Sequence, residues 1–350
     1  MKRLLFTCLV ALVLSQSANA APPRARSASI PPVQLPLGYR VTILHTGWGA
    51  DYFEAKRINN RGEMVGTLDS SKGEFKDQPH AGFYSDGKVI DLHLLVPGNR
   101  KIPGSLPTDL NDQGEVLFYA LSELDTTWVY SDGQVKSLNH LARHAHLDRS
   151  INLEATAINN SGDIVGTTIV DNVYRNGFVL HEGHVQLLQP LPQHPHSEAI
   201  SINNFGRVVG RSFDDLNHDV DFRAVWFEGE NARDLGVPFS FAFQINDAGH
   251  ILGLGQNGGF LWTGQLPVAG IPFEPKGMNA ADQIVGTAGP WPPHAFIYSQ
   301  GVTTDLNELI DPATGWLLMQ ANDINEVGQI VGFGRVNENF AGFLLDPIWE

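Results

Sequence analysis

The sequence has almost no cysteine, since Cys8 is the only one in 350 residues. It lies in the apolar run Leu4–Leu14, which follows the basic start Met1-Lys2-Arg3 and precedes the small-residue pattern Ala18-Asn19-Ala20. This arrangement is typical of a secretory signal peptide, which we predict over residues 1–20 and which is too short to span a membrane. The mature chain then has no cysteine, so burial alone must hold the fold together without disulfides.

Positive charge is also scarce, with 23 Lys and Arg against 38 Asp and Glu and a formal net charge of −15. An acidic exported chain is a poor binder of nucleic acid or anionic membrane surfaces, so we expect neither as a partner and no membrane insertion. Residues 21–37 contain five prolines and are predicted to form an extended linker. The remaining residues, 38–350, are then one repeat domain.

The common catalytic motifs are absent. The sequence contains no Gly-x-Ser-x-Gly elbow, no His-Glu-x-x-His pair and no phosphate-binding loop. Scattered acids such as Glu115, Glu123 and Asp125 would suit glycoside hydrolysis if two of them met, but nothing in the sequence selects a pair. Catalytic residues therefore stay unassigned, and a binding role is favoured over an enzymatic one.

The sequence does contain a sevenfold repeat, best seen in Ala155–Gly166, which reads ATAINNSGDIVG. Each copy has one reference asparagine, and successive copies are 52, 48, 44, 43, 33 and 46 residues apart. A period in this range is typical of a solenoid, a propeller or an array. The reference asparagines are Asn59, Asn111, Asn159, Asn203, Asn246, Asn279 and Asn325.

Each reference asparagine is predicted to build a hairpin turn. Its side chain can bond the backbone two residues on, and the glycine three residues after it accepts a positive φ. In the sixth copy Asp282 replaces this glycine, and aspartate tolerates the left-handed region better than most residues. The asparagines are therefore interpreted as structural turn residues rather than as a ring of ligands.

An aromatic strand, a second tight turn and a fourth strand follow each hairpin, as in Gly177–Leu180, Glu182-Gly183 and Val185–Leu188. Four short antiparallel strands per repeat predict an all-β, seven-bladed propeller; the short fifth repeat also allows six or eight blades. The seventh copy lacks its fourth strand. Residues 38–45 resemble that strand, so we expect the N-terminal strand to complete the last blade and close the ring.

The pattern Ile-Asn-x-x-Gly-x-Ile-Val-Gly, followed by His294-Ala295-Phe296, resembles the HAF family of probable extracellular repeat proteins. The resemblance covers roughly residues 38–345. It implies export and a β-repeat fold but no particular chemistry. The histidine of this motif, present as His80 and His294, is expected to make a hydrogen bond between blades.

Two polar connections suggest metals. Asp215, Asn217, Asp219 and Asp221 follow the 1-3-5-7 spacing of calcium loops, although the glycine at position six and the glutamate at position twelve are missing; a plain acidic loop is the alternative. His-x-His pairs suit zinc, nickel or copper, and two of them occur in neighbouring connections; solvated histidines are the alternative. These are His144, His146, His194 and His196.

Two tryptophans, Trp291 and Trp316, could stack on sugars, with packing between blades as the alternative. The sequence thus favours an exported, monomeric binding or scaffold propeller, periplasmic or extracellular, that recognises a protein or glycan through loops on one face. The alternatives are a propeller hydrolase or lyase acting on polysaccharide and a metal-binding exported protein. Calcium is the one cofactor considered.

Overall fold

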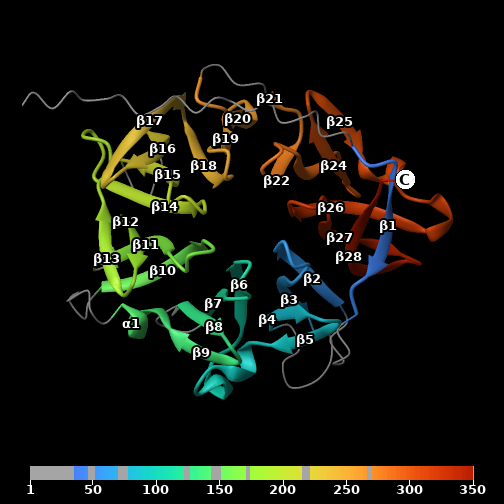
Figure 1. Cartoon of the computed structure of the whole chain (residues 1–350), viewed down its shortest axis with the longest axis horizontal. Coiled ribbons are helices and arrows are strands. Elements are labelled where there is room, and N and C mark those ends of the chain that lie inside the picture. Colours follow the sequence, from blue (N-terminus) through green and yellow to red (C-terminus); the bar gives the residue numbers. More distant parts are fainter. Residues whose placement is uncertain are drawn as a thin grey trace, which may run out of the picture. The chain divides into compact units, whose positions relative to one another are not determined.

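The computed structural model describes residues 35–45, 52–69, 78–121, 127–142, 151–170, 174–214, 221–265 and 270–349. The predicted signal peptide and residues 21–34 of the predicted linker lie outside this part of the chain. Seven four-stranded antiparallel sheets are arranged in a ring (Figure 1). The predicted seven-bladed β-propeller is confirmed.

The blades follow one another along the chain, and the first strand of each lies innermost. Blade 1 contains β2 (Tyr52–Ile58), β3 (Met64–Asp69), β4 (His80–Ser85) and β5 (Lys88–Asp91). Blade 2 contains β6 (Ser105–Leu110), β7 (Val116–Ala120), β8 (Thr127–Ser131) and β9 (Gln134–Ser137). Blade 3 contains β10 (Ile151–Ile158), β11 (Ile164–Val170), β12 (Tyr174–His181) and β13 (His184–Leu188).

The remaining blades repeat this order. Blade 4 contains β14 (His196–Ile202), β15 (Val208–Phe213), β16 (Phe222–Glu228) and β17 (Asn231–Pro238). Blade 5 contains β18 (Ser240–Ile245), β19 (Ile251–Gly255), β20 (Gly258–Trp262) and β21 (Gly270–Ile271). Blade 6 contains β22 (Glu274–Met278), β23 (Ile284–Ala288), β24 (His294–Ser299) and β25 (Val302–Asp305). Blade 7 contains β26 (Trp316–Ile324), β27 (Ile330–Val336), β28 (Asn339–Ile348) and β1 (Gly38–Ile43).

In the described ranges, only short helical turns interrupt the strands. The α-helical turn is α1 (Leu138–Leu141), and the 3-10 turns are η1 (His93–Leu95), η2 (Asn99–Lys101), η4 (Leu306–Leu309) and η5 (Pro312–Thr314). No helix in the described part of the chain is long and apolar enough to cross a membrane.

The N-terminal strand closes the ring, as the sequence predicts. β1 pairs antiparallel with β28 in a register that runs from Gly38 opposite Ile348 to Ile43 opposite Phe343. The pairing continues on both sides, where Leu37 N donates to Ile348 O and Leu44 N donates to Gly342 O. The last blade is therefore built from both ends of the domain.

Apolar packing between neighbouring blades takes the place of disulfides. One cluster, for example, joins Val165 and Leu188 of blade 3 to Ala199, Val208 and Val225 of blade 4. Seven such clusters of described residues lie between neighbouring blades, so each blade is buried on both sides by its neighbours.

The alternating strand direction gives the ring two different faces. The turns between first and second strands, and those between third and fourth strands, emerge on one face, which we call the hairpin face. The connections between second and third strands and those between blades emerge on the other, which we call the loop face. The repeated turns have the expected left-handed residue: φ is 80° at Gly162 and 58° at its replacement Asp282.

One sequence expectation is wrong. His80 Nδ1 lies 2.8 Å from Asp91 Oδ2, and His294 Nδ1 bonds Asp305 Oδ2. Both bonds join the third and fourth strands of one blade rather than two blades. Asp305 Oδ1 also accepts the N–H of Asn307, so this pair fixes the chain where it leaves the blade.

Candidate functional site in the central channel

The reference asparagines form a closed ring around the channel. Asn59 Oδ1 accepts the N–H groups of Arg61 and Glu63 at 3.0 and 2.9 Å, which caps its own turn, as the sequence suggests. Its Nδ2 donates 2.9 Å to the carbonyl of Asn111 in the next blade. The same donation recurs in every blade and ends with Asn325 Nδ2 on the carbonyl of Asn59 at 3.0 Å. The asparagines therefore join blades as well as capping turns.

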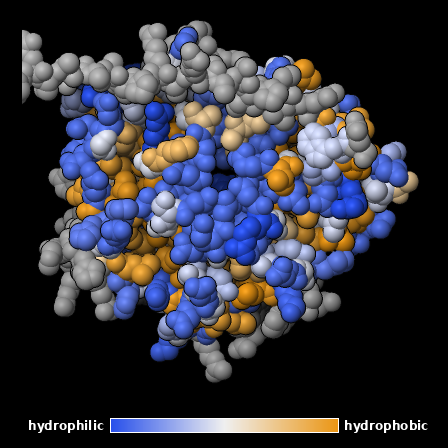
Figure 2. All heavy atoms as spheres, viewed as in Figure 1, coloured by the Kyte–Doolittle hydropathy of each residue, from blue (hydrophilic) through white to orange (hydrophobic). Residues whose placement is uncertain are grey.

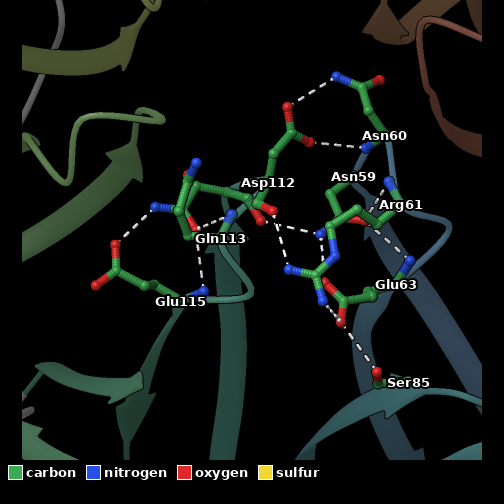
Figure 3. A network of polar contacts seen from close by, with 9 residues as sticks. Asn59, Asn60, Arg61, Glu63, Ser85, Asp112, Gln113 and Glu115 are labelled. Atoms are coloured by element: carbon green, nitrogen blue, oxygen red, sulfur yellow. Dashed lines mark hydrogen bonds and ion pairs between the residues drawn. The ribbon is translucent and has the colours of Figure 1, made fainter. Parts of the chain in front are cut away.

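The residue after each asparagine forms a second, more exposed ring. Asp112 Oδ1 accepts the backbone N–H of Asn60, and its Oδ2 accepts from the Asn60 amide (Figure 3). Asp247 and Glu326 occupy the same position in blades 5 and 7. Burial raises the pKa of Glu326, and the nearby carboxylates of Asp247 and Asp112 add to this. This end of the channel, the hairpin end, is acidic.

A β-bulge interrupts each innermost strand three residues before its asparagine. In β2, for example, the pairing with β3 shifts between Ala55 and Arg57, which leaves Lys56 unpaired. A bulge re-aims the extra side chain, and all seven bulged residues line the channel. They differ from blade to blade, and we call them the bulge ring: Lys56, Thr108, Thr156, Ile200, Phe243, Lys276 and Asn322.

The channel is wide towards the loop face and narrow at the hairpin end. The wide part, which we call the wide mouth, has a volume of about 500 Å³, against about 190 Å³ at the hairpin end. Leu106, Phe241, Glu274 and Gln320, near the starts of the innermost strands, line the wide mouth. On the face seen in Figure 2, hydrophilic residues gather around the central hollow.

A partly buried charge cluster lies along the channel. Arg57 Nε is 4.0 Å from Asp109 Oδ1, and its charge also acts on Asp323. Each aspartate accepts a backbone N–H of the following blade: Asp109 from Ile158 at 2.9 Å and Asp323 from Ile58 at 3.0 Å. Burial raises the pKa of both carboxyls, that of Asp109 to about 6, against the opposing effect of Arg57.

The raised pKa of Asp109 predicts a pH-dependent stability. The folded state favours the neutral acid, so stability falls as the pH rises from the ordinary pKa of 3.8 through about 6. Asp109→Asn keeps an oxygen for Ile158 and removes the charge. We expect it to raise the free energy of unfolding by about 1–3 kcal/mol at pH 7.5 and to change little near pH 4. Denaturant unfolding at both pH values measures this; an equal effect at both would show that the charge is not its cause.

The predicted zinc, nickel or copper ligands are only partly described. His194 is buried, with Nδ1 3.0 Å from Ser212 Oγ and Nε2 3.5 Å from Asp221. His196 is also buried; its Nδ1 accepts from Arg175 N at 3.4 Å, and its ring lies against Phe213. Thus His194 packs into blade 4, and His196 lies between blades 3 and 4. His144 and His146 lie outside the described residues.

The predicted calcium loop is described only at its end. Asp221 pairs with Arg223 at 2.7 Å, which lowers the pKa of that carboxyl. Asp215, Asn217 and Asp219 lie outside the described residues. Within the described ranges, no group of three or more histidine, cysteine, aspartate or glutamate side chains is arranged to hold a metal ion.

The two predicted sugar-stacking tryptophans lie in different surroundings. Trp316 is half-buried and packs edge-to-face on Phe343 of its own blade. Trp291 is 75% exposed, in the connection between β23 and β24 on the loop face. Its ring is 6.5 Å from Phe340, which stacks on Phe333. Trp291 alone is therefore presented to solvent.

Of the scattered acids, the structure describes only Glu115. Glu115 accepts from Asn111 Nδ2 at 2.7 Å and so belongs to a hairpin turn. Glu123 and Asp125 lie outside the described residues. The sequence analysis missed the bulge ring, although a signal was present: the third residue before each asparagine varies, while the fourth residue before it is always Ala or Pro and the residue directly before it is always Ile, Leu or Met.

The fold and the channel define a seven-bladed β-propeller, and comparison with solved structures agrees. The match to a puromycin-hydrolyzing peptidase from Mycobacterium tuberculosis covers 90% of this chain and 54% of the peptidase chain, with a TM-score of 0.55 and 9% sequence identity. A second match is the β-propeller domain of the Trilobed protease from Pyrococcus furiosus, described as having an open velcro topology. It covers 84% of this chain and 95% of that domain, with a TM-score of 0.54 and 12% sequence identity.

The match to a streptogramin B lyase covers 89% of this chain and the whole lyase chain, with a TM-score of 0.50 and 10% sequence identity. At these identities the similarity shows the fold alone. No protein-family model matches the chain, and no curated protein matches it.

Proposed function

We propose that this protein is an exported binding propeller that takes part of a protein or glycan ligand into the wide mouth of its channel. Export is supported by the signal-peptide pattern and by the resemblance to HAF repeat proteins. The loops around the mouth would contact the rest of the ligand.

The bulge ring is the observation that carries this proposal. Seven bulges stand at equivalent positions, yet they direct different side chains into the channel, from Lys56 through Ile200 to Phe243. A purely structural position in a repeat would repeat its residue, as the asparagines do. Variation at a fixed geometry is typical of recognition, in which each side chain meets a different part of a ligand.

The loop face offers a further contact for a glycan. Trp291 and Phe340 present neighbouring aromatic rings there, with exposed fractions of 75% and 45%. Aromatic side chains pack their faces on the apolar faces of sugar rings, and this buries apolar surface of both partners. A chain longer than the channel mouth could therefore extend towards blades 6 and 7.

Removing the largest bulged side chain should weaken binding. Phe243 lines both parts of the channel and lies 6.1 Å from Phe241. We expect Phe243→Ala to lower affinity for a ligand found on glycan and peptide arrays by about 10- to 100-fold, because a buried aromatic contact is lost. Isothermal titration calorimetry measures the affinity.

Phe205 provides the matched control. It is 77% exposed at a turn tip on the hairpin face, away from the wide mouth. Phe205→Ala should leave affinity unchanged. Equal losses in both variants, or none in Phe243→Ala, would place the binding site elsewhere.

The alternative is a hydrolase or lyase acting on polysaccharide, and one observation favours it: two carboxyls with raised pKa values lie beside Arg57 in the channel. Both carboxyls already accept backbone N–H groups, which favours a structural role. Reducing-end assays on a polysaccharide panel separate the two functions. Degradation that is lost in Asp109→Asn would support the enzyme.

A further inference from the structure

The two ends of the channel differ in the charge of the residues that line them. Among the described residues that line the wide mouth, three are cationic and one is a carboxylate: Lys56, Arg57, Lys276 and Glu274. Those lining the hairpin end include one cation and five carboxyl groups: Arg57, Asp109, Asp112, Asp247, Asp323 and Glu326. The basic mouth stands out because the whole chain has a net charge of −15.

The lysines reach the mouth through their bulges. Lys56 is the bulged residue of blade 1 and Lys276 that of blade 6, so they lie on either side of Asn322 in blade 7. Each pairs with a glutamate two residues earlier in its strand, Glu54 or Glu274. The lysine side chains remain 38% and 32% exposed, and ion pairs at such exposure are worth little, so an incoming anion can compete for them.

Apolar and neutral polar groups complete the mouth. Phe241 and Phe243 line it from blade 5, together with Leu254 of that blade. Thr108 contributes a hydroxyl whose oxygen is buried and has no hydrogen-bond partner among the described residues. The volume of about 500 Å³ lies within the range of small-ligand sites, about 300–1,000 Å³.

We propose that the wide mouth binds a carboxylate-bearing sugar of an acidic glycan, an inference that rests on the proposed function. The apolar face of the sugar ring packs on Phe243, and its carboxylate lies between Lys56 and Lys276. A sugar hydroxyl hydrogen-bonds Thr108, whose hydroxyl has no partner among the described residues. A charged channel with low-dielectric walls focuses its field, so the basic mouth attracts the anion and the acidic hairpin end stops it from passing through.

An acidic sugar fits this mouth better than an acidic peptide. The aromatic rings and the hydroxyl of Thr108 match a ring that is apolar on its faces and hydroxylated at its edge. A peptide carboxylate would use the lysines alone. The acidic peptide is therefore the outcome to be separated by experiment.

Calorimetry with the full mature protein tests the proposal. The probes are trimers of galacturonate, glucuronate and mannuronate, their carboxyl-reduced neutral counterparts, and poly-L-glutamate. We expect at least one uronate trimer to bind at least tenfold more tightly than its neutral counterpart. The double variant Lys56→Gln/Lys276→Gln should lose about 10- to 100-fold in affinity for that trimer, because two charge-assisted hydrogen bonds are lost, and should leave the neutral sugar unchanged.

Two exposed lysines on outer strands serve as controls, since Lys88→Gln/Lys136→Gln makes the same change in net charge away from the channel. This control should retain its affinity. Loss of affinity in both double variants would mean that overall charge, not the mouth, attracts the ligand, and would overturn the proposal. Lysine-dependent binding of poly-L-glutamate without binding of any uronate would overturn its glycan part.

The outcomes also separate this inference from the proposed function. If a neutral sugar binds as well as its acidic counterpart and Phe243→Ala weakens the binding of both, the mouth is a binding site but the proposal of an acidic ligand is wrong. If Phe243→Ala affects no ligand found on the arrays and no uronate binds, both are wrong.

Discussion

Deleting residues 38–46 should unfold or aggregate the protein. The deletion removes β1, which pairs with β28 over six residues, and it removes two side chains, Tyr39 and Leu44, that are each 3% exposed. Losing such side chains costs about 2–5 kcal/mol each. Together with the lost strand pairing, the loss is comparable to the entire stability of a typical domain, about 5–15 kcal/mol.

The deletion also exposes the edge of β28, and an unpaired edge is a template for pairing with other chains. Thermal melting and size-exclusion chromatography measure both effects. Arg40→Ala is the control, because the Arg40 side chain is 73% exposed and its ion pair with Asp346 lies at the surface. We expect that variant to stay within about 0.5 kcal/mol of the parent. A truncated chain that melts like the full mature protein would show that β1 does not close the ring.

Replacing one reference asparagine by alanine should lower the free energy of unfolding by about 2–4 kcal/mol. Asn203 is 5% exposed; its Oδ1 accepts from Phe205 N and Arg207 N at 3.1 and 2.9 Å, and its Nδ2 donates to Asn246 O at 3.0 Å. Asn203→Ala therefore leaves two part-buried N–H groups and one buried carbonyl without their side-chain partner, and each such loss costs up to about 1–3 kcal/mol before relaxation. Denaturant unfolding measures the change.

Asn203→Asp separates the two roles of this residue. It keeps the oxygen that caps the turn but turns the donor to the next blade into an acceptor facing the carbonyl of Asn246. If the bond between blades matters, we expect the aspartate variant at pH 7 to lose as much free energy of unfolding as the alanine variant. Asn204→Ala is the matched control, since Asn204 is the adjacent, exposed asparagine; it should cost less than about 1 kcal/mol. A loss in the aspartate variant no larger than this control would leave turn capping as the only role.

The repeat made the architecture predictable, because a blade is a local structure. Its turns need an asparagine and a left-handed residue at fixed positions, and both are visible in the sequence even where Asp282 replaces glycine. The closing strand was also visible, since residues 38–45 resemble the strand that the last copy lacks. Local hydrogen bonding and edge pairing are properties of short segments, so a single sequence carries them.

The candidate site was less predictable, because the sequence motifs pointed to loops that are rich in histidine or in acidic residues. His194 instead packs inside blade 4, His196 lies between blades 3 and 4, and Trp316 packs on Phe343. Only the tertiary structure shows that a bulge turns Lys56 and Lys276 towards one cavity, since their separation along the chain is large. The bond of His80 to Asp91 within a blade was likewise a matter of strand register.

The sequence by itself determined the propeller class, the turn residues and the way the ring closes, because each depends on contacts within about 50 residues or on a repeated pattern. It favoured seven blades but allowed six or eight, and the structure has seven. The tertiary structure decided which residues face the channel and that its two ends differ in charge. Those properties arise where seven strands from distant parts of the chain converge on one axis, and an electric field or a cavity there is the sum of all seven.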